Sequence, residues 1–306
     1  MAAAIVITVI VVAAWPGEKE PEYQGKKLSE WAEPYASLAE EISQERQDLL
    51  KNEDADAIRH MGTNALPFLL KWTREKPPHW RKQMAAIGRK MPYVISRYNS
   101  PASWIYGDPG FSRPTAAAWA FWVLGSQASP AVPELTRIAS DVTAPEVSQR
   151  AVFALGHIGK DGFGSLLAIL SNPQQAAAVR ARAAWFVSRD YMGTNSILAV
   201  PLLIQSLNDL DPFLEMVAAD GLGDLALQPD SVVPALTVCL QGIYPPPVRR
   251  AASDALGKFG PRAKAAVPAL LKVARETPPV LGLFATNALR KIAPEVLTNE
   301  ANAGHF

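Results

Sequence analysis

The sequence is poor in the residues that build most metal and disulfide sites. Its 306 residues include one cysteine, Cys239, and only four histidines. A single cysteine excludes a disulfide framework and any cysteine-based zinc site. No two of the histidines are spaced as a pair of metal ligands; they are His60, His79, His157 and His305. We therefore expect no bound metal and no cofactor.

An excess of charge of either sign is also missing. Thirty Lys and Arg stand against 29 Asp and Glu, and 49% of the residues are hydrophobic. Such a chain is too apolar and too weakly charged to be disordered. A general nucleic-acid binder needs a basic excess, so nucleic acid is not the expected partner.

The first apolar run is too short to cross a bilayer. Residues 2–15 are uncharged and mostly apolar. As a helix they rise about 21 Å, against a hydrocarbon core of about 30 Å. This length is typical of a signal peptide or a short membrane anchor over residues 1–16, although no Lys or Arg precedes the run. The expected location is therefore membrane-anchored or outside the cytoplasm; the alternatives are a buried element and a cytoplasmic protein.

Two blocks of opposite charge follow. Residues 18–56 hold twelve acids and five bases, and residues 71–97 hold eight bases and one acid. We interpret residues 17–52 as a charged helical leader. The basic block interleaves with aromatic residues, which leaves open a nucleic-acid binder acting through residues 71–97. Two solvated helix faces that neutralise each other are the simpler interpretation.

Alanine and proline are both abundant, at 49 and 26 residues. Alanine favours helix and proline interrupts it, so many short helices must alternate with proline-marked turns. A repeat explains this. An alanine-rich segment ending in a leucine-type residue recurs in steps of 31 to 35, with that residue at positions 124, 155, 187, 222, 256 and 289. Four prolines near the start of a second segment repeat with a step of about 34; they are Pro133, Pro201, Pro234 and Pro268.

Each copy is therefore predicted to be a pair of helices. In one copy Val248, Ala252 and Leu256 form a single apolar stripe, and Gly257 and Gly260 suit the helix end. A proline such as Pro268 then opens the second helix, where its missing N–H costs nothing. We expect an all-α fold, an α–α superhelix or solenoid of about six or seven helix pairs.

The alanine-rich first helix, the Leu-Gly ending and the Ala-Val-Pro-x-Leu start of the second helix resemble HEAT repeats of the short bacterial, phycobilisome-lyase-like type. The resemblance covers about residues 53–76 and 113–297. It implies a scaffold for partner proteins, and it implies that Arg150, Arg182 and Arg250 tie neighbouring repeats together. We divide the chain into the leader, a first repeat with an insertion at 53–112, and a repeat array at 113–300.

Two sets of residues are candidate partner-binding sites. The insertion at 77–112 breaks the repeat period, and insertions in arrays often lie on the binding face; a segment that caps the core of the first repeat is the alternative. The candidate residues of the insertion are Trp80, Arg81, Trp104 and Tyr106. The second set lies two positions before the core leucine, about 200° around the helix, and consists of Trp122, Phe153 and Trp185. In stacked repeats these three rings predict an apolar row on the outer face, with packing at the edge of the core as the alternative.

No catalytic motif is present: the sequence has no glycine-rich phosphate loop, no His-Glu-x-x-His and no Gly-x-Ser-x-Gly. His60 and His157 fall at a variable repeat position, where we expect exposed polar side chains. The expected function is a non-enzymatic protein-binding scaffold with an unknown protein partner, and with the membrane as a further partner through residues 2–15. The alternative is a HEAT-like enzyme, either a bilin lyase or a DNA-base glycosylase.

Overall fold

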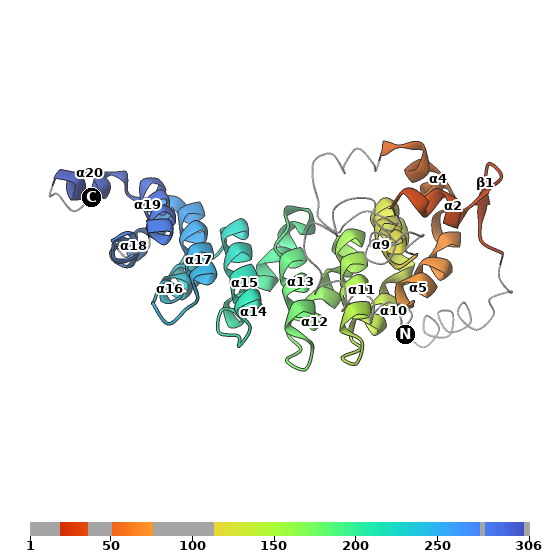
Figure 1. Cartoon of the computed structure of the whole chain (residues 1–306), viewed down its shortest axis with the longest axis horizontal. Helices are drawn as coiled ribbons and strands as arrows, with labels where there is room; N and C mark the ends of the chain where they lie inside the picture. The colour runs from red at the N-terminus through yellow and green to blue at the C-terminus, as the bar shows by residue number, and fades with distance from the viewer. Residues whose placement is uncertain (1–18, 36–50, 76–112, 276–278, 303–306) are drawn as a thin grey trace, which may run out of the picture. The chain divides into compact units, whose positions relative to one another are not determined.

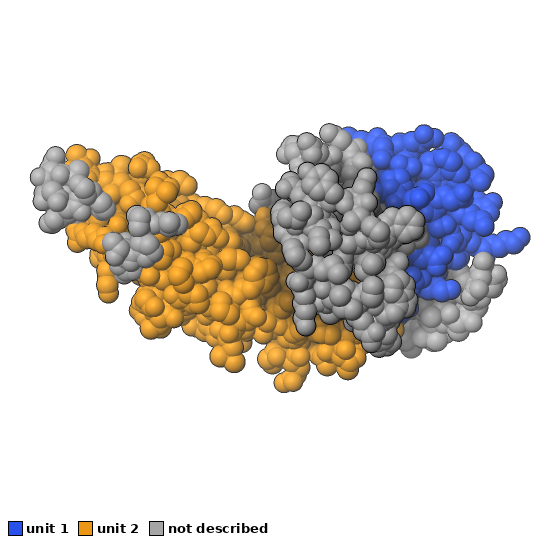
Figure 2. Space-filling model, viewed as in Figure 1, with its two compact units in different colours: residues 1–124 blue, residues 125–306 orange. Residues whose placement is uncertain are grey.

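The computed structural model describes residues 19–35, 51–75, 113–275 and 279–302. The chain divides into two compact units, residues 1–124 and residues 125–306 (Figure 2). The candidate residues Trp80, Arg81, Trp104 and Tyr106 lie outside the described residues, as does the apolar run at 2–15.

The first unit begins with a small hairpin. Strand β1 (Glu22–Tyr23) pairs with the antiparallel strand β2 (Lys26–Lys27). Gln24 and Gly25 have φ angles of 50° and 77°, as a two-residue hairpin turn of this kind requires. The leader at 17–52 is therefore not wholly helical. Helix α2 (Leu28–Ala32) and the 3-10 helix η1 (Glu33–Tyr35) follow the hairpin.

One helix pair and one further helix complete the described part of the first unit. They are α4 (Glu53–Met61), η3 (Gly62–Ala65), α5 (Leu66–Arg74) and α9 (Arg113–Leu124). Asn52 caps α4 by accepting a hydrogen bond from the N–H of Ala55 at 2.9 Å. Helix α9 packs on α5, α4 and η1, so it belongs to the first unit although its sequence follows the repeat pattern.

The second unit is an α–α superhelix of stacked helix pairs, which confirms the predicted fold class (Figure 1). We call the first helix of each pair the A helix and the second the B helix. The A helices are α11 (Pro145–Ile158), α13 (Ala177–Val187), α15 (Pro212–Leu225), α17 (Pro246–Phe259) and α19 (Pro279–Ile292). The B helices are α10 (Val132–Ala139), α12 (Phe163–Leu170), α14 (Val200–Ser206), α16 (Pro229–Val238), α18 (Val267–Ala274) and α20 (Pro294–Asn302). The 3-10 segments are η4 (Gly125–Ala131), η5 (Lys160–Gly162), η6 (Asp190–Ala199) and η7 (Gly260–Ala266).

The repeat positions predicted from the sequence form the core. The leucine-type residues at 124, 155, 187, 222, 256 and 289 are all at most 4% exposed. Pro133, Pro201 and Pro268 occupy the first turn of α10, α14 and α18, as predicted. The prediction is wrong for Pro234, which lies inside α16. That helix begins earlier, at Pro229, after Gln228 adopts a left-handed conformation with φ of 48°.

Neighbouring A helices approach closely because small residues separate them. A Cβ atom added to Gly223 of α15 would lie 2.6 Å from the Cα atom of Ala255 in α17. One repeat later, a Cβ atom on Gly257 would lie 3.2 Å from the Cα atom of Ala288. Each B helix packs mainly against the A helix that follows it, and makes few contacts with the next B helix. The A helices therefore form the continuous spine of the second unit.

Candidate functional site

A row of charged side chains joins the A helices of the later repeats. Arg189, Asp224 and Lys258 each stand two residues after a core position; Arg189 lies just after α13, and Asp224 and Lys258 lie in the last turns of α15 and α17. The Asp224 carboxylate pairs with Arg189 Nη1 at 3.3 Å and with Lys258 Nζ at 2.5 Å. All three side chains are between 27% and 42% exposed. This charge row satisfies its own charges across three repeats, so its first role is to hold the stack together.

In the repeat that begins with α11, the residue at the same position packs against aromatic rings. His157 of α11 lies against Phe153 and against Phe186 of α13, with ring centroids 4.4 and 5.1 Å away. Burial, assisted by the nearby Arg182 charge, lowers the pKa of His157 to about 3, so the imidazole is neutral. The prediction that His157 is an exposed polar residue is therefore wrong. The residue at the position of His157 varies among the repeats, and the prediction equates this variation with exposure. In the structure Phe186 of the neighbouring helix α13 packs against it.

The predicted outer row of rings is not a single exposed row. Phe153 is only 2% exposed and packs edge-on against Phe186 at 5.9 Å, so it is part of the core. Trp122 and Trp185 are half-buried; Trp122 lies 4.9 Å from Trp119, and Trp185 lies 4.8 Å from Phe186. Phe153, two residues before the core leucine, thus faces the neighbouring A helix rather than solvent. Partner binding by Trp122 and Trp185 stays a prediction.

Two of the three arginines suggested by the resemblance do reach neighbouring repeats. The guanidinium of Arg182 lies 6.0 Å from the ring of Phe153. Arg250 approaches the sulfur of Met216 in the preceding A helix at 3.9 Å and the ring of Phe284 in the following one at 5.6 Å. These contacts across helices support a structural role for both side chains.

A second surface feature lies in four of the loops that lead from a B helix to the next A helix; the fifth, at 275–278, lies mostly outside the described residues. We call these four loops, residues 140–144, 171–176, 207–211 and 239–245, together with the first turn of the helix that follows each, the loop ridge. The two most exposed large apolar side chains of the described residues are Leu210, at 101%, and Ile243, at 81%. Phe213, in the first turn of α15, is 56% exposed. A cluster of exposed apolar side chains is a typical mark of an interaction site.

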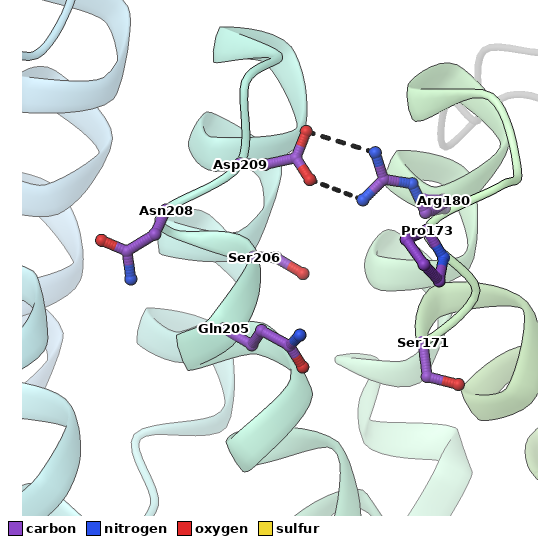
Figure 3. Close-up of a pocket in the computed structure, with 7 residues that line it drawn as sticks. All are labelled: Ser171, Pro173, Arg180, Gln205, Ser206, Asn208 and Asp209. Atoms are coloured by element: carbon purple, nitrogen blue, oxygen red, sulfur yellow. Dashed lines mark hydrogen bonds and ion pairs between the residues drawn. The ribbon is translucent and has the colours of Figure 1, made fainter.

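A polar pocket of about 280 Å³ lies at the loop ridge, between the α12–α13 loop and the end of α14 with the loop that follows it (Figure 3). Its lining residues are Ser171, Pro173, Arg180, Gln205, Ser206, Asn208 and Asp209. The Arg180 guanidinium donates to both carboxylate oxygens of Asp209, at 2.5 and 3.2 Å. These bonds hold the pKa of Asp209 below its usual range, so the pair stays ionised.

Three further kinds of functional feature would be a set of metal ligands, a reactive thiol and a membrane-spanning helix. Among the described residues, no group of three or more His, Cys, Asp or Glu side chains is arranged to hold a metal ion. Cys239 is 1% exposed, and burial raises the pKa of its thiol to about 12, so it is a poor nucleophile. No described helix combines the length and apolarity needed to cross a bilayer.

The sequence contains a signal for these ion pairs. Asp224 is flanked by Arg189 and Lys258 at intervals of 35 and 34 residues, one repeat each way. Opposite charges one repeat apart, at one repeat position, predict ion pairs between stacked helices. The loop ridge had a weaker signal, since Leu210 and Ile243 stand in segments that otherwise read as polar turns.

Comparison with known proteins gives a match to one family. The family model for HEAT repeats matches residues 199–291. No curated protein matches the chain in sequence. Among solved structures, a designed armadillo repeat protein in complex with the peptide (KR)4 is 18% identical with a TM-score of 0.47, and covers 74% of this chain and 98% of its own. An engineered protein is 16% identical with a TM-score of 0.43, and covers 91% of this chain and 77% of its own.

The matched residues run from the end of η6 through α14 to α19, which is the part of the spine that contains Asp224, Lys258 and the small residues between the helices. The earlier pairs α11–α12 and α13–α14 follow the same plan of core positions and stacked A helices. Residues 199–291 therefore match the HEAT repeat family, and the earlier helix pairs of the second unit share the same stacked architecture.

Proposed function

We propose that the protein is a non-enzymatic scaffold that binds a partner protein through the loop ridge of its repeats. One observation carries this proposal: the most exposed apolar side chains of the described residues, Leu210 and Ile243, lie on adjacent loops of the ridge. Both side chains are almost fully exposed to solvent, so a partner can bury them without breaking contacts within the chain. The A-helix spine, in contrast, uses its charged and aromatic side chains to stack the repeats.

Contacts between and within the loops of the ridge order this surface before a partner binds. The Tyr244 hydroxyl lies 3.5 Å from the Asn208 side-chain oxygen, which links the loop containing Ile243 to the loop containing Leu210. Asp211 caps α15 through the N–H groups of Phe213 and Leu214, at 2.9 and 3.2 Å. A surface that is ordered before binding pays less conformational entropy when a partner arrives.

Capture of partners by the full chain tests this function. We expect the wild-type protein, coupled to a resin, to retain a partner that the double variant Leu210→Ser/Ile243→Ser does not retain. The control is Leu198→Ser, which removes an apolar side chain that is 59% exposed in η6, at the opposite end of the helices. Equal capture by wild type, double variant and control would place binding elsewhere on the molecule.

Localisation is a separate proposal that rests on the apolar run at residues 2–15. We propose that this run anchors the protein to a membrane or directs its export. Fractionation of cells that express the full chain, next to cells that express a chain without residues 1–16, tests it. The full chain is expected with the membrane or outside the cytoplasm and the shortened chain in the cytosol; two cytosolic proteins would contradict the proposal.

A further inference from the structure

The loop ridge has an uneven charge that the whole chain does not share. It contains five acidic side chains, Asp141, Glu146, Asp209, Asp211 and Glu215, and two basic ones, Arg180 and Arg249. The net charge of the ridge is therefore −3, whereas that of the chain is +1. Both bases are engaged within the protein: Arg180 pairs with Asp209, and Arg249 is 7% exposed and donates to the Leu240 carbonyl at 2.9 Å.

The negative charge is concentrated beside the exposed apolar residues. Asp209 and Asp211 flank Leu210 in the chain, and Glu215 lies one turn into α15. Burial and the charges of Asp209 and Asp211 raise the pKa of Glu215. Burial raises the pKa of Tyr244, with smaller contributions from Cys239 and Glu215. The exposed apolar side chains therefore lie beside a net negative charge, which attracts cations.

The adjacent pocket offers hydrogen-bond acceptors more readily than donors. The hydroxyl of Ser206 donates to the Leu202 carbonyl at 2.8 Å, and that of Ser171 donates to the Ala168 carbonyl at 3.0 Å. Both protons are thereby used, while the lone pairs of the oxygens remain available. The Arg180 guanidinium donates to Asp209 and to the Gln175 carbonyl. An anion entering the pocket would find its strongest donors already engaged.

Two further features favour a cation in the pocket. Ser171 follows the last residue of α12 and Ser206 is the last residue of α14, so two helix C-termini, with their negative dipole ends, border it. In Figure 3, the side chains of Gln205 and Ser206 extend toward the loop of Pro173, while Asn208 points away from that loop. The Gln205 amide is exposed at the rim and provides a carbonyl oxygen to a donor.

We propose that the loop ridge binds a protein segment in which a lysine or arginine stands next to large aliphatic or aromatic residues. The basic side chain enters the pocket formed by Ser171, Gln205 and Ser206, and the apolar neighbours cover Leu210, Phe213 and Ile243. This inference rests on the proposed scaffold function and adds the chemistry of the partner.

A random peptide library displayed on phage is the probe, selected on the immobilised full chain. Binders are then counter-selected on the folded Leu210→Ser/Ile243→Ser double variant, so that only peptides dependent on the ridge remain. We expect the remaining pool to be enriched in Lys or Arg adjacent to Leu, Ile or Phe. A remaining pool enriched in Asp or Glu, or no enrichment at all, overturns the inference. Binders that do not depend on the ridge would overturn the inference while leaving a scaffold function in place.

A matched pair of charge variants tests the pocket itself. Gln205→Lys places a positive charge at the rim, and Gln127→Lys places the same charge on an exposed residue of η4, outside the ridge. We expect the selected peptides to bind the Gln205→Lys variant about tenfold more weakly than wild type, and the Gln127→Lys variant unchanged. Equal binding to both variants overturns the placement of the cation.

Two other occupants of the ridge are distinguished in the same series. Phosphatidylcholine vesicles that bind wild type but not the double variant would identify a lipid surface and overturn the inference. A dimer in sedimentation experiments that the double variant loses would identify a second copy of this chain, with the same consequence.

Discussion

The early and the late repeats of the second unit place different chemistry at the same repeat positions. Between α11 and α13, the residue after the core leucine is Gly156, and the ring of Phe186 fills the space that it leaves. Between α15 and α17, Gly223 takes the same place, and the backbone of Ala255 fills the space. One position further on, His157 packs against rings, whereas Asp224 pairs with Lys258. The fold thus requires a small residue and a complementary neighbour, and it accepts either rings or ions as that neighbour.

The largest expected effect follows from filling the glycine positions. In Gly223→Ala, the new Cβ atom would meet the Ala255 backbone at 2.6 Å, which cannot rotate away. We expect the free energy of unfolding to fall by about 2–3 kcal/mol, the typical cost of overpacking. Gly156→Ala would place its Cβ atom 2.2 Å from the ring of Phe186, which is itself 1% exposed, so we expect a loss at least as large. Urea denaturation of the full chain measures both.

The matched control is Gly164→Ala, in α12, where nothing lies within 4 Å of the added atom. Alanine has the higher helix propensity, so this variant is expected to gain about 0.5–1 kcal/mol. If Gly223→Ala behaved like Gly164→Ala, the close approach of the A helices would not limit the residue at that position.

These contacts also show where sequence reasoning succeeded and where it stopped. The repeat period fixes which residues face the core of each pair, and Leu155, Leu222 and Leu256 are buried as predicted. The period does not say which residue of the next A helix lies opposite a given position. His157 and Phe153 were therefore placed on the outside, although Phe186 covers both. The surface between repeats depends on pairs of residues about 30 positions apart, and those pairs vary from copy to copy.

The loop ridge was missed for a different reason. Its loops differ in length and sequence, so no repeat position identifies Leu210 or Ile243. An exposed apolar residue in a turn becomes informative only when a second one lies on the adjacent loop, and only the stacking of the repeats shows this. The pocket likewise requires Ser171 and Ser206 from two different repeats to lie beside one another.

The second prediction separates the early repeats from the late ones by pH. The pKa of His157 is about 3 in the folded protein and 6.5 ordinarily, so between these values the unfolded chain binds the additional proton. The stabilisation is fully present above pH 6.5 and is lost as the pH falls toward 3. At pH 4.5 the loss is up to about 3 kcal/mol, because each of the two pH units below 6.5 contributes about 1.4 kcal/mol.

The difference in unfolding free energy between wild type and His157→Leu, followed from pH 7.5 to pH 4.5, isolates this histidine from the carboxyl groups that titrate in both proteins. We expect wild type to lose stability relative to the variant as the pH falls. Parallel curves for the two proteins would mean that His157 is protonated without penalty and is not enclosed by the rings.

The third prediction concerns the charge row of the late repeats. Asp224→Asn removes two ion pairs and leaves Arg189 and Lys258 facing a neutral group. Because all three side chains are about a quarter to two-fifths exposed, the expected loss is only about 1 kcal/mol. The loss should shrink in high salt, which screens exposed pairs, whereas the cost of Gly156→Ala should not. Asp230→Asn, at an exposed site in α16, is the control; a loss at Asp224 that is independent of salt would contradict an ionic origin.

The smallest effect is expected where the two kinds of contact meet. The Arg189 guanidinium lies 4.0 Å from the Trp185 ring centroid and also pairs with Asp224 at 3.3 Å. Trp185 is one of the aromatic residues of the early repeats and Asp224 is part of the charge row, so Arg189 contacts both groups. A double-mutant cycle with Trp185→Leu and Arg189→Met should give a coupling energy of about 0.5–1 kcal/mol.

A second cycle, Arg189→Met with Asp224→Asn, should give a similar coupling at low salt and a smaller one at high salt. The coupling with Trp185 should change less, because a guanidinium stacked on a half-buried ring is shielded from ions. If both coupling energies fell equally in high salt, Arg189 would act only through its charge. Stacking of its guanidinium on Trp185 would then contribute nothing to the contact between the early and the late repeats.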